Sequence, residues 1–211
     1  MHVSPRSPAQ PEALLARLGG LGELAAGVLP GAASFRMQEI ANDWGVVYAV
    51  HVADMNRDGK PDIVAVHNTE VAWFENPSWK KHLICQGVGQ KDNVAVALHD
   101  VDGDGRLDMA LAADWQPTNT ETGGTLWYLR NPGTDEPWKA VPLGNEPTLH
   151  RMRWADLDGD GKPELIAVPL HGRGTKGPKW DQVGARILIY KPRVDGPWEM
   201  DVAASNLTET H

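Results

Sequence analysis

The stretch that decides the fold is Asp100-Val101-Asp102-Gly103-Asp104-Gly105-Arg106-Leu107-Asp108, which places four carboxylates around two glycines. Related stretches begin at Asp54 and at Asp156, so the chain carries the same pattern three times. Carboxylates at this spacing suit a hard cation with oxygen ligands better than they suit a protein core or a helix. Repetition of one pattern along a chain indicates an array of similar structural units.

Composition narrows the class of protein. With 211 residues, 41% of them hydrophobic, the chain is long enough to bury one sizeable core. The formal net charge is −8, and much of the acidity lies in the three repeated stretches. We therefore expect no nucleic-acid partner, because such binding depends on basic patches that face phosphates. The acidity is instead interpreted as a demand for metal ions.

The single cysteine and the N-terminal segment set further limits. Cys85 excludes a disulfide within the chain and any zinc cluster of several cysteines, and its apolar neighbours predict a small buried side chain. No transmembrane segment is expected, because no apolar run approaches the ~18 residues that span a bilayer. Residues 1–34 are expected to be a leader or linker, and they contain no clear secretory signal.

Each acidic stretch lies between two apolar runs. In the first repeat these runs cover residues 46–52 and 63–66, and their alternation predicts β-strands. A third run carries aromatic residues and ends before a proline, and a fourth begins at a tryptophan. Four short strands in each repeat of about 50 residues are typical of a β-propeller blade. Tryptophans at equivalent positions of the repeats are expected to pack the blades.

The expected fold is therefore all-β, with β-propeller blades of four antiparallel strands. A propeller segment over residues 35–211 is predicted to hold three blades, near residues 46–92, 93–147 and 148–204. Flanking strands are expected at Phe35–Ile40 and from Asn206 onward. Because propellers usually close with about 4–8 blades, the chain is expected to be a partial or open propeller. The remaining propeller blades, or self-association, would then cover its open edges.

The repeated loops are candidate calcium sites. Calcium takes six to eight oxygen ligands, and a tight loop can direct side chains from its positions 1, 3, 5 and 9 toward one ion, with a glycine at position 6 for the turn. The predicted metal ligands are Asp54, Asn56, Asp58 and Asp62 in the first loop, Asp100, Asp102, Asp104 and Asp108 in the second, and Asp156, Asp158, Asp160 and Glu164 in the third. The first loop carries one charge fewer and is expected to bind most weakly.

Two alternatives compete with this interpretation. An EF-hand opens with a similar pattern but needs a glutamate at position 12 and flanking helices. Position 12 is Ala65, Leu111 or Ala167, and the flanks are predicted strands, so the EF-hand is excluded. A solvated acidic turn that binds no ion stays open as the second alternative.

The loops and their strands resemble FG-GAP or VCBS-type repeats, the calcium-binding blades of integrin-α-like propellers. This resemblance covers residues 35–211 and implies calcium at the loops. Residues 148–156 and 169–174 are also similar to the propeller part of aldos-2-ulose dehydratase-like proteins, a group that includes lyases acting on sugars. No catalytic residue of that group is carried over to this chain.

A second site is predicted on the face opposite the loops. There the start of the first strand and the turn after the second strand would bring together His150, His171 and His211. Such histidines can hold zinc or another divalent metal, or act as acid and base near neutral pH. His150, Arg151 and His171 are the candidate catalytic residues. The alternative, that these are ordinary loop residues, stays open.

Two functions follow as expectations. The first is a calcium-binding scaffold with a structural and recognition role, whose ligand would be a carbohydrate or a protein. It would be extracytoplasmic, either secreted or periplasmic, because weak calcium sites need about 10⁻⁴–10⁻³ M ion. The second is an enzyme, a carbohydrate lyase (dehydratase) or isomerase, that uses the histidine-rich face.

Overall fold

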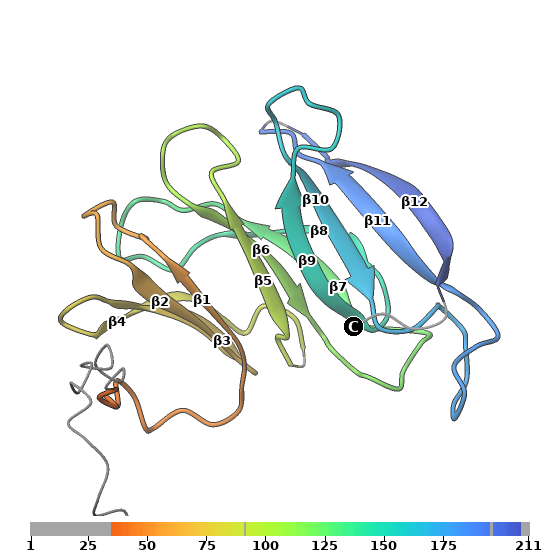
Figure 1. Ribbon diagram of the computed structural model, residues 1–211, viewed down its shortest axis with the longest axis horizontal. Helices are drawn as coiled ribbons and strands as arrows, with labels where there is room; N and C mark the ends of the chain where they lie inside the picture. The colour runs from red at the N-terminus through yellow and green to blue at the C-terminus, as the bar shows by residue number, and fades with distance from the viewer. Residues whose placement is uncertain (1–34, 91, 195, 208–211) are drawn as a thin grey trace, which may run out of the picture. The chain divides into compact units, whose positions relative to one another are not determined.

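The computed structural model describes residues 35–90, 92–194 and 196–207, and the described residues from 40 onward form one compact unit. The described residues contain twelve strands and no helix (Figure 1). The strands are β1 Val47–Ala53, β2 Asp62–His67, β3 Glu70–Glu75, β4 Lys80–Gln86, β5 Ala95–His99, β6 Asp108–Ala113, β7 Thr125–Leu129, β8 Ala140–Asn145, β9 Leu149–Ala155, β10 Glu164–Pro169, β11 Ala185–Lys191 and β12 Glu199–Leu207.

These strands form three separate four-stranded sheets in chain order, β1 to β4, β5 to β8 and β9 to β12. All neighbouring strands pair antiparallel, and no sheet closes into a barrel. Each sheet corresponds to one repeat of the sequence, so the predicted all-β fold of a partial or open propeller is confirmed. We call the sheets blade 1, blade 2 and blade 3.

The strands on either side of each acidic loop pair in the same register in all three blades. Each loop joins the first and second strands of its blade. The residue before the loop pairs with the acid at loop position 9 in every blade: Ala53 with Asp62, His99 with Asp108, and Ala155 with Glu164. The acid at position 9 is therefore the first residue of the second strand, and the other acids lie on the loop.

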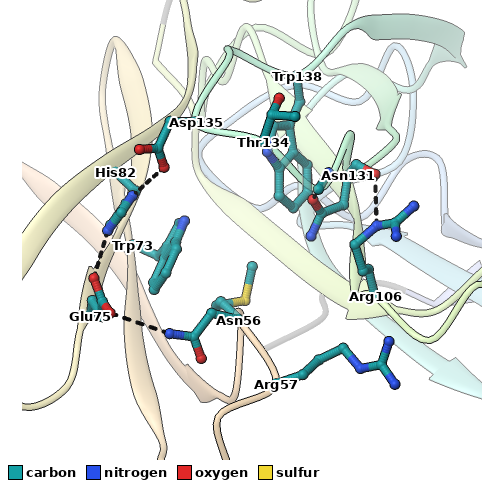
Figure 2. Close-up of a pocket in the computed structure, with 12 residues that line it drawn as sticks. Asn56, Arg57, Trp73, Glu75, His82, Arg106, Asn131, Thr134, Asp135 and Trp138 are labelled. Atoms are coloured by element: carbon teal, nitrogen blue, oxygen red, sulfur yellow. Dashed lines mark hydrogen bonds and ion pairs between the residues drawn. The ribbon is translucent and has the colours of Figure 1, made fainter.

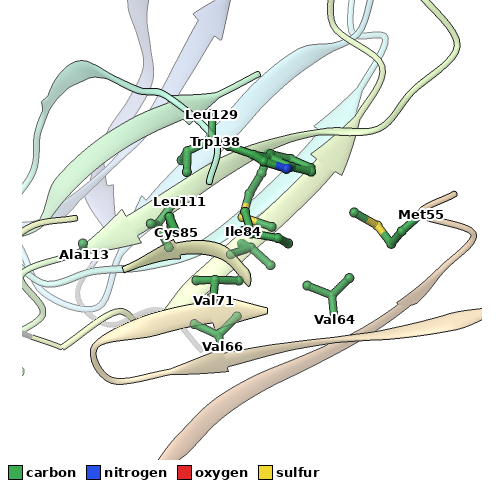
Figure 3. Close-up of a cluster of buried hydrophobic side chains, with 12 residues drawn as sticks. Met55, Val64, Val66, Val71, Ile84, Cys85, Leu111, Ala113, Leu129 and Trp138 are labelled. Carbon is green, nitrogen blue, oxygen red and sulfur yellow. The ribbon is translucent and has the colours of Figure 1, made fainter. Parts of the chain in front are cut away.

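Apolar side chains hold neighbouring blades together. One buried cluster joins blades 1 and 2 and includes Val64, Ile84, Leu111 and Trp138 (Figure 3). A second cluster joins blades 2 and 3 through residues such as Leu126, Met152 and Leu188. Because buried apolar surface contributes about 25 cal/mol per Å², packing between blades is a main source of stability. Trp73, Trp127 and Trp198 also pack against these clusters, as predicted for the repeated tryptophans, whereas Trp79, another of them, is in neither cluster. Trp154 of β9 packs against the second cluster as well.

The expected flanking strand at Phe35–Ile40 is wrong. Residues 35–46 are described and contain no strand, and β1 pairs only with β2. Alternation of apolar and polar residues suits a strand, but a strand also needs a partner edge. At the other end, Asn206 and Leu207 belong to β12, and residues 208–211 lie outside the described part. A search of the described residues for a long apolar helix able to cross a membrane found none.

Cys85 is buried on β4, and burial raises the pKa of its thiol to about 12. Only the thiolate reacts with disulfide reagents, and an unfolded cysteine has a pKa of about 8.5. At pH 8 the native protein should therefore react with Ellman's reagent about a thousandfold more slowly than the chain in denaturant. Equal rates would contradict the burial of this side chain.

Candidate metal centre

The acid at loop position 9 is a buried backbone acceptor in all three loops. Asp62, Asp108 and Glu164 are buried although each is a carboxylic acid. Each accepts the backbone N–H of the second residue of its own loop: Met55 to Asp62 at 2.9 Å, Val101 to Asp108 at 3.1 Å and Leu157 to Glu164 at 3.0 Å. This bond ties the beginning of the loop to its end.

The other oxygen of this acid fastens the loop to the end of the third strand. Oδ1 of Asp62 accepts the backbone N–H of Asn76 at 2.9 Å, and Oδ1 of Asp108 accepts that of Asn131 at 2.8 Å. In blade 3 the equivalent residue is Pro192, which has no N–H to donate. There the longer Glu164 replaces aspartate, and its Oε1 lies 3.6 Å from Nζ of Lys191.

Asp108 makes one further contact, because the hydroxyl of Tyr128 donates to its Oδ2 at 2.9 Å. Burial raises the pKa of Asp108, and the hydrogen bonds from Asn131 and Tyr128 partly oppose that shift. Burial and the neighbouring Asp108 charge raise the pKa of Tyr128. The sequence predicted position 9 as a metal ligand, whereas the structure also gives it a role in holding the loop that needs no ion.

The second loop gathers three carboxylates. Asp100, Asp102 and Asp108 each offer an oxygen that lies within 4.8 Å of the others. Oδ2 of Asp100 accepts the N–H of Gly105 at 2.8 Å, which fixes the side chain. Its Oδ1 is buried without a hydrogen-bond partner. A buried carboxylate oxygen left unpaired is costly, and hard oxygen ligands in this arrangement suit calcium. The residues of this loop therefore fit the metal that their pattern predicts.

The acid at position 5 of the second loop contacts arginines instead of joining the group of three carboxylates. Asp104 forms an ion pair with Arg106 and lies 3.7 Å from Nη2 of Arg130, and it is not part of the three-carboxylate group. Arg130 also contacts the group itself, with Nε 2.5 Å from Oδ2 of Asp102. The loop thus divides its acids between a cluster that suits a cation and a pair of arginines.

The third loop also gathers three carboxylates, but a lysine lies among them. Asp156, Asp158 and Glu164 offer oxygens within 4.8 Å of one another. Nζ of Lys191 lies 2.7 Å from Asp158, and its hydrogen bond lowers the pKa of that carboxyl. Both oxygens of Asp156 accept backbone N–H groups, at 2.8 and 3.0 Å. Asp160 lies outside this group of three.

The acids of the first loop do not form such a group among the described residues. Asp54 accepts the N–H groups of Asp58 and Gly59, at 3.1 and 2.9 Å. Asp58 pairs with Lys60 at 2.7 Å, and that hydrogen bond lowers the pKa of its carboxyl. The amide of Asn56 donates to Glu75 at 3.4 Å.

Sequence reasoning missed three residues outside the acidic loops that contact the predicted metal ligands. Glu75, Arg130 and Lys191 occupy the same place at the end of the third strand and contact loop position 3 of their own blades. Aligning the three repeats on their strand pairing would have placed these residues together, although the sequence does not show that they reach the loop. Their charges make the loops different from one another.

The histidines of the opposite face pack against separate tryptophans. His150 on β9 stacks on Trp115, with ring centroids 5.6 Å apart, and its Nε2 lies 2.9 Å from Nη1 of Arg151. His171 is buried and stacks on Trp180 at 4.3 Å. His211 lies outside the described residues. Within the described part, neither group of three possible metal ligands includes a histidine. Zinc at this face, and catalysis by these residues, stay predictions without support here.

Comparison with known families places the acidic repeats in a described family. A family model described as FG-GAP-like repeat matches residues 54–111 and again residues 100–167, so together the matches cover more than half of the chain. Each match begins at the first aspartate of an acidic loop. A search of curated proteins found no match. The resemblance to dehydratase-like proteins therefore stays unconfirmed.

Proposed function

The chain belongs to the family of FG-GAP-like repeats, and from this we propose that it is a calcium-stabilised blade scaffold whose second loop is the principal calcium site. The observation that carries the proposal is the group of Asp100, Asp102 and Asp108, together with the unpaired buried oxygen of Asp100. Bound calcium would neutralise these carboxylates and supply the missing partner of that oxygen. The chain's own contribution is to hold the three acids in place through backbone hydrogen bonds.

The charges around each loop support a ranking of the sites. In the second loop, Arg130 is in contact with one of the three acids, Asp102, while its other contact is with Asp104 outside the group. In the third loop, Lys191 contacts both Asp158 and Glu164 and would have to be displaced by an ion. We therefore expect the third loop to bind calcium more weakly than the second. The first loop, whose acids do not gather, ranks last.

The proposed location is outside the cytoplasm. FG-GAP-like repeats are typically found in extracellular proteins. Calcium sites of extracellular modules have dissociation constants of about 10⁻⁴–10⁻³ M, which are values that calcium fills only where it is abundant. A loop with three gathered carboxylates and a competing arginine suits this range.

Calcium should raise the thermal stability of the chain. With a dissociation constant of about 10⁻⁴ M, 10 mM calcium would add about 2.7 kcal/mol to the free energy of unfolding. For a chain of this size that corresponds to a rise in Tm of about 5–10 °C. Calorimetry in calcium and in EGTA measures this difference, with magnesium as the control ion. An unchanged Tm in 10 mM calcium would refute the proposal.

A scaffold of blades also needs partners for its outer faces, and within the described residues 40–207 no other blade covers one face of blade 1. Val50 of β1 occupies the same place, four residues before the loop, as Val96 of β5 and Met152 of β9. Val96 and Met152 are each only 1% exposed because the preceding blade covers them, whereas Val50 is 60% exposed. We call this surface of Val50 and Val52 the β1 face.

Blade 3 has the complementary uncovered surface. Leu157 is 49% exposed, whereas its equivalent Met55 in blade 1 is 5% exposed and packs against blade 2. A hollow there is lined by Leu157, Ile189 and Met200. The equivalent positions of blade 1 line a cavity whose opposite wall is formed by blade 2. We call this surface the β12 face. Among the described blades, none covers it.

We propose that a second copy of the chain covers both surfaces. The positions of the β1 face are those through which blades 2 and 3 pack against the blade before them. The positions of the β12 face are those through which blades 1 and 2 pack against the blade after them. Each copy therefore carries both halves of an interface that already occurs twice within the chain. Two copies would provide six blades, within the usual range of about 4–8 for a closed propeller.

A further inference from the structure

A cavity of about 440 Å³ lies between blades 1 and 2, beside the first two acidic loops (Figure 2). Blade 1 lines it with Trp73, Glu75 and His82, and blade 2 lines it with Asn131, Asp135 and Trp138. Its volume lies in the range of about 300–1,000 Å³ that is common for small-molecule sites. Neither the family match nor the proposed calcium sites account for this cavity.

One wall of the cavity is a fixed aromatic surface. The indole of Trp73 stacks on the imidazole of His82, with centroids 4.1 Å apart and planes inclined by 11°. Both nitrogens of His82 are engaged, one with Glu75 at 3.0 Å and the other with Asp135 of blade 2 at 2.8 Å. Figure 2 shows Trp73 between His82 and the open middle of the cavity. One face of the indole is therefore held and the other is presented to a ligand.

Arg57 contributes a cation at the rim of the same cavity (Figure 2). It occupies loop position 4, where the other loops have Gly103 and Gly159, and it has the left-handed φ of 65° that suits glycine. This conformation is strained for arginine, and such strain often marks functional positions. The guanidinium lies against the bare backbone of Gly105, with atoms 3.0–3.3 Å from where a Cβ would stand.

Among the described residues, the guanidinium of Arg57 takes part in no ion pair and no hydrogen bond. The other arginine of the cavity differs, because Arg106 pairs with Asp104 and donates to the carbonyl of Asn131 at 3.4 Å. Arg57 is therefore the group available for an anion. A guanidinium binds a carboxylate through two parallel hydrogen bonds.

We propose that this cavity binds a hexuronic acid, a sugar ring that carries one carboxylate. The open face of Trp73 would pack against the C–H groups of the ring, and Arg57 would receive the carboxylate. The carboxylates of Glu75 and Asp135 can accept sugar hydroxyls, and their negative charge repels a doubly charged phosphate more strongly than a singly charged carboxylate. The site lies beside the acidic loops, on the side away from His150 and His171.

Arg57→Gly separates binding from stability. It installs the residue that the other two loops have at this position, so Tm should not fall, because glycine relieves the left-handed strain. Binding of methyl β-D-glucuronide, measured by isothermal titration in EGTA, should weaken by about tenfold or more. Lys179→Gln removes one positive charge from an exposed position outside the cavity and should bind as the wild type does. Use of EGTA makes the result independent of the calcium proposal.

Methyl β-D-glucoside, which carries a neutral hydroxymethyl group in place of the carboxylate, should bind the wild-type protein at least about tenfold more weakly than the glucuronide. Inorganic phosphate should not compete with the glucuronide for binding. The proposal is overturned if the wild type does not bind the glucuronide at 10 mM. A dissociation constant above about 10⁻² M would be very weak binding. Equal binding by Arg57→Gly, or equal binding of the glucoside or phosphate, would overturn it as well.

Discussion

Replacing Asp108 by alanine is expected to destabilise the protein by about 3–5 kcal/mol, even without calcium. The change removes the acceptor of three groups: the backbone N–H of Val101, that of Asn131 and the hydroxyl of Tyr128. A buried donor left unpaired costs about 1–3 kcal/mol; the donor of Asn131 is buried and the other two are partly buried. Relief of the buried charge offsets part of the sum. Because native domains are stable by only about 5–15 kcal/mol, urea unfolding in EGTA should show a large shift.

Asp104→Ala is the matched control, four positions earlier in the same loop. Its carboxylate pairs with partly exposed arginines and accepts one backbone N–H, that of Arg106 within its own loop, whereas it supports no donor from the third strand and no tyrosine hydroxyl. Loss of such a surface ion pair should cost about 1 kcal/mol or less. If both variants lose the same stability, the structural role assigned to Asp108 is wrong.

Val50→Asp is expected to halve the molecular mass in solution. If a second copy covers the β1 face, the wild type should elute at twice the 23.0 kDa mass of the chain in light scattering after size exclusion. A carboxylate at this position would be buried without a partner in the dimer, which is strongly unfavourable. In the single chain the side chain is 60% exposed, so the circular dichroism spectrum should not change.

Val141→Asp provides the control for this variant, because Val141 is also exposed but lies on β8, the last strand of the middle blade. It should leave the dimer intact. A wild-type protein that stays monomeric at about 100 μM, well above typical dimer affinities, would contradict the proposed second copy. Equal dissociation by both variants would contradict the choice of the β1 face.

The fold could be predicted from sequence because several signals agree in each repeat. The loop pattern, the flanking alternation and the tryptophan that precedes the fourth strand recur together, and the structure places four strands around them in every blade. Where only one signal was present the prediction failed. Phe35–Ile40 alternates in polarity, but nothing else in that segment marks a blade, and it forms no strand.

The candidate site was harder to predict, because spacing identifies acids but not their partners. Asp108 and Asp104 both fit the ligand pattern, yet one accepts buried backbone donors and the other faces arginines. That difference depends on how the end of the third strand approaches the loop. Lys191 enters the third loop in the same way, from outside the repeated stretch. The positions of the acids alone do not reveal these contacts.

The cavity between blades 1 and 2 is a further example of contacts that the sequence alone does not reveal. His82 and Asp135 are 53 positions apart and meet only because two blades pack together. Arg57 gave a local signal that could have been noticed, since it stands where both sister loops have glycine. Comparing the repeats position by position would therefore have pointed to Arg57, although not to the aromatic wall opposite it.

The central claim is that the second loop is the principal calcium site, and calcium titration of matched loop variants tests it most directly. Asp102→Asn and Asp158→Asn make the same change at position 3 of the second and third loops. Isothermal titration of chelated protein should show a strongest site that is kept in Asp158→Asn and lost in Asp102→Asn. Identical isotherms for the wild type and Asp102→Asn, or no binding at millimolar calcium, would contradict the claim.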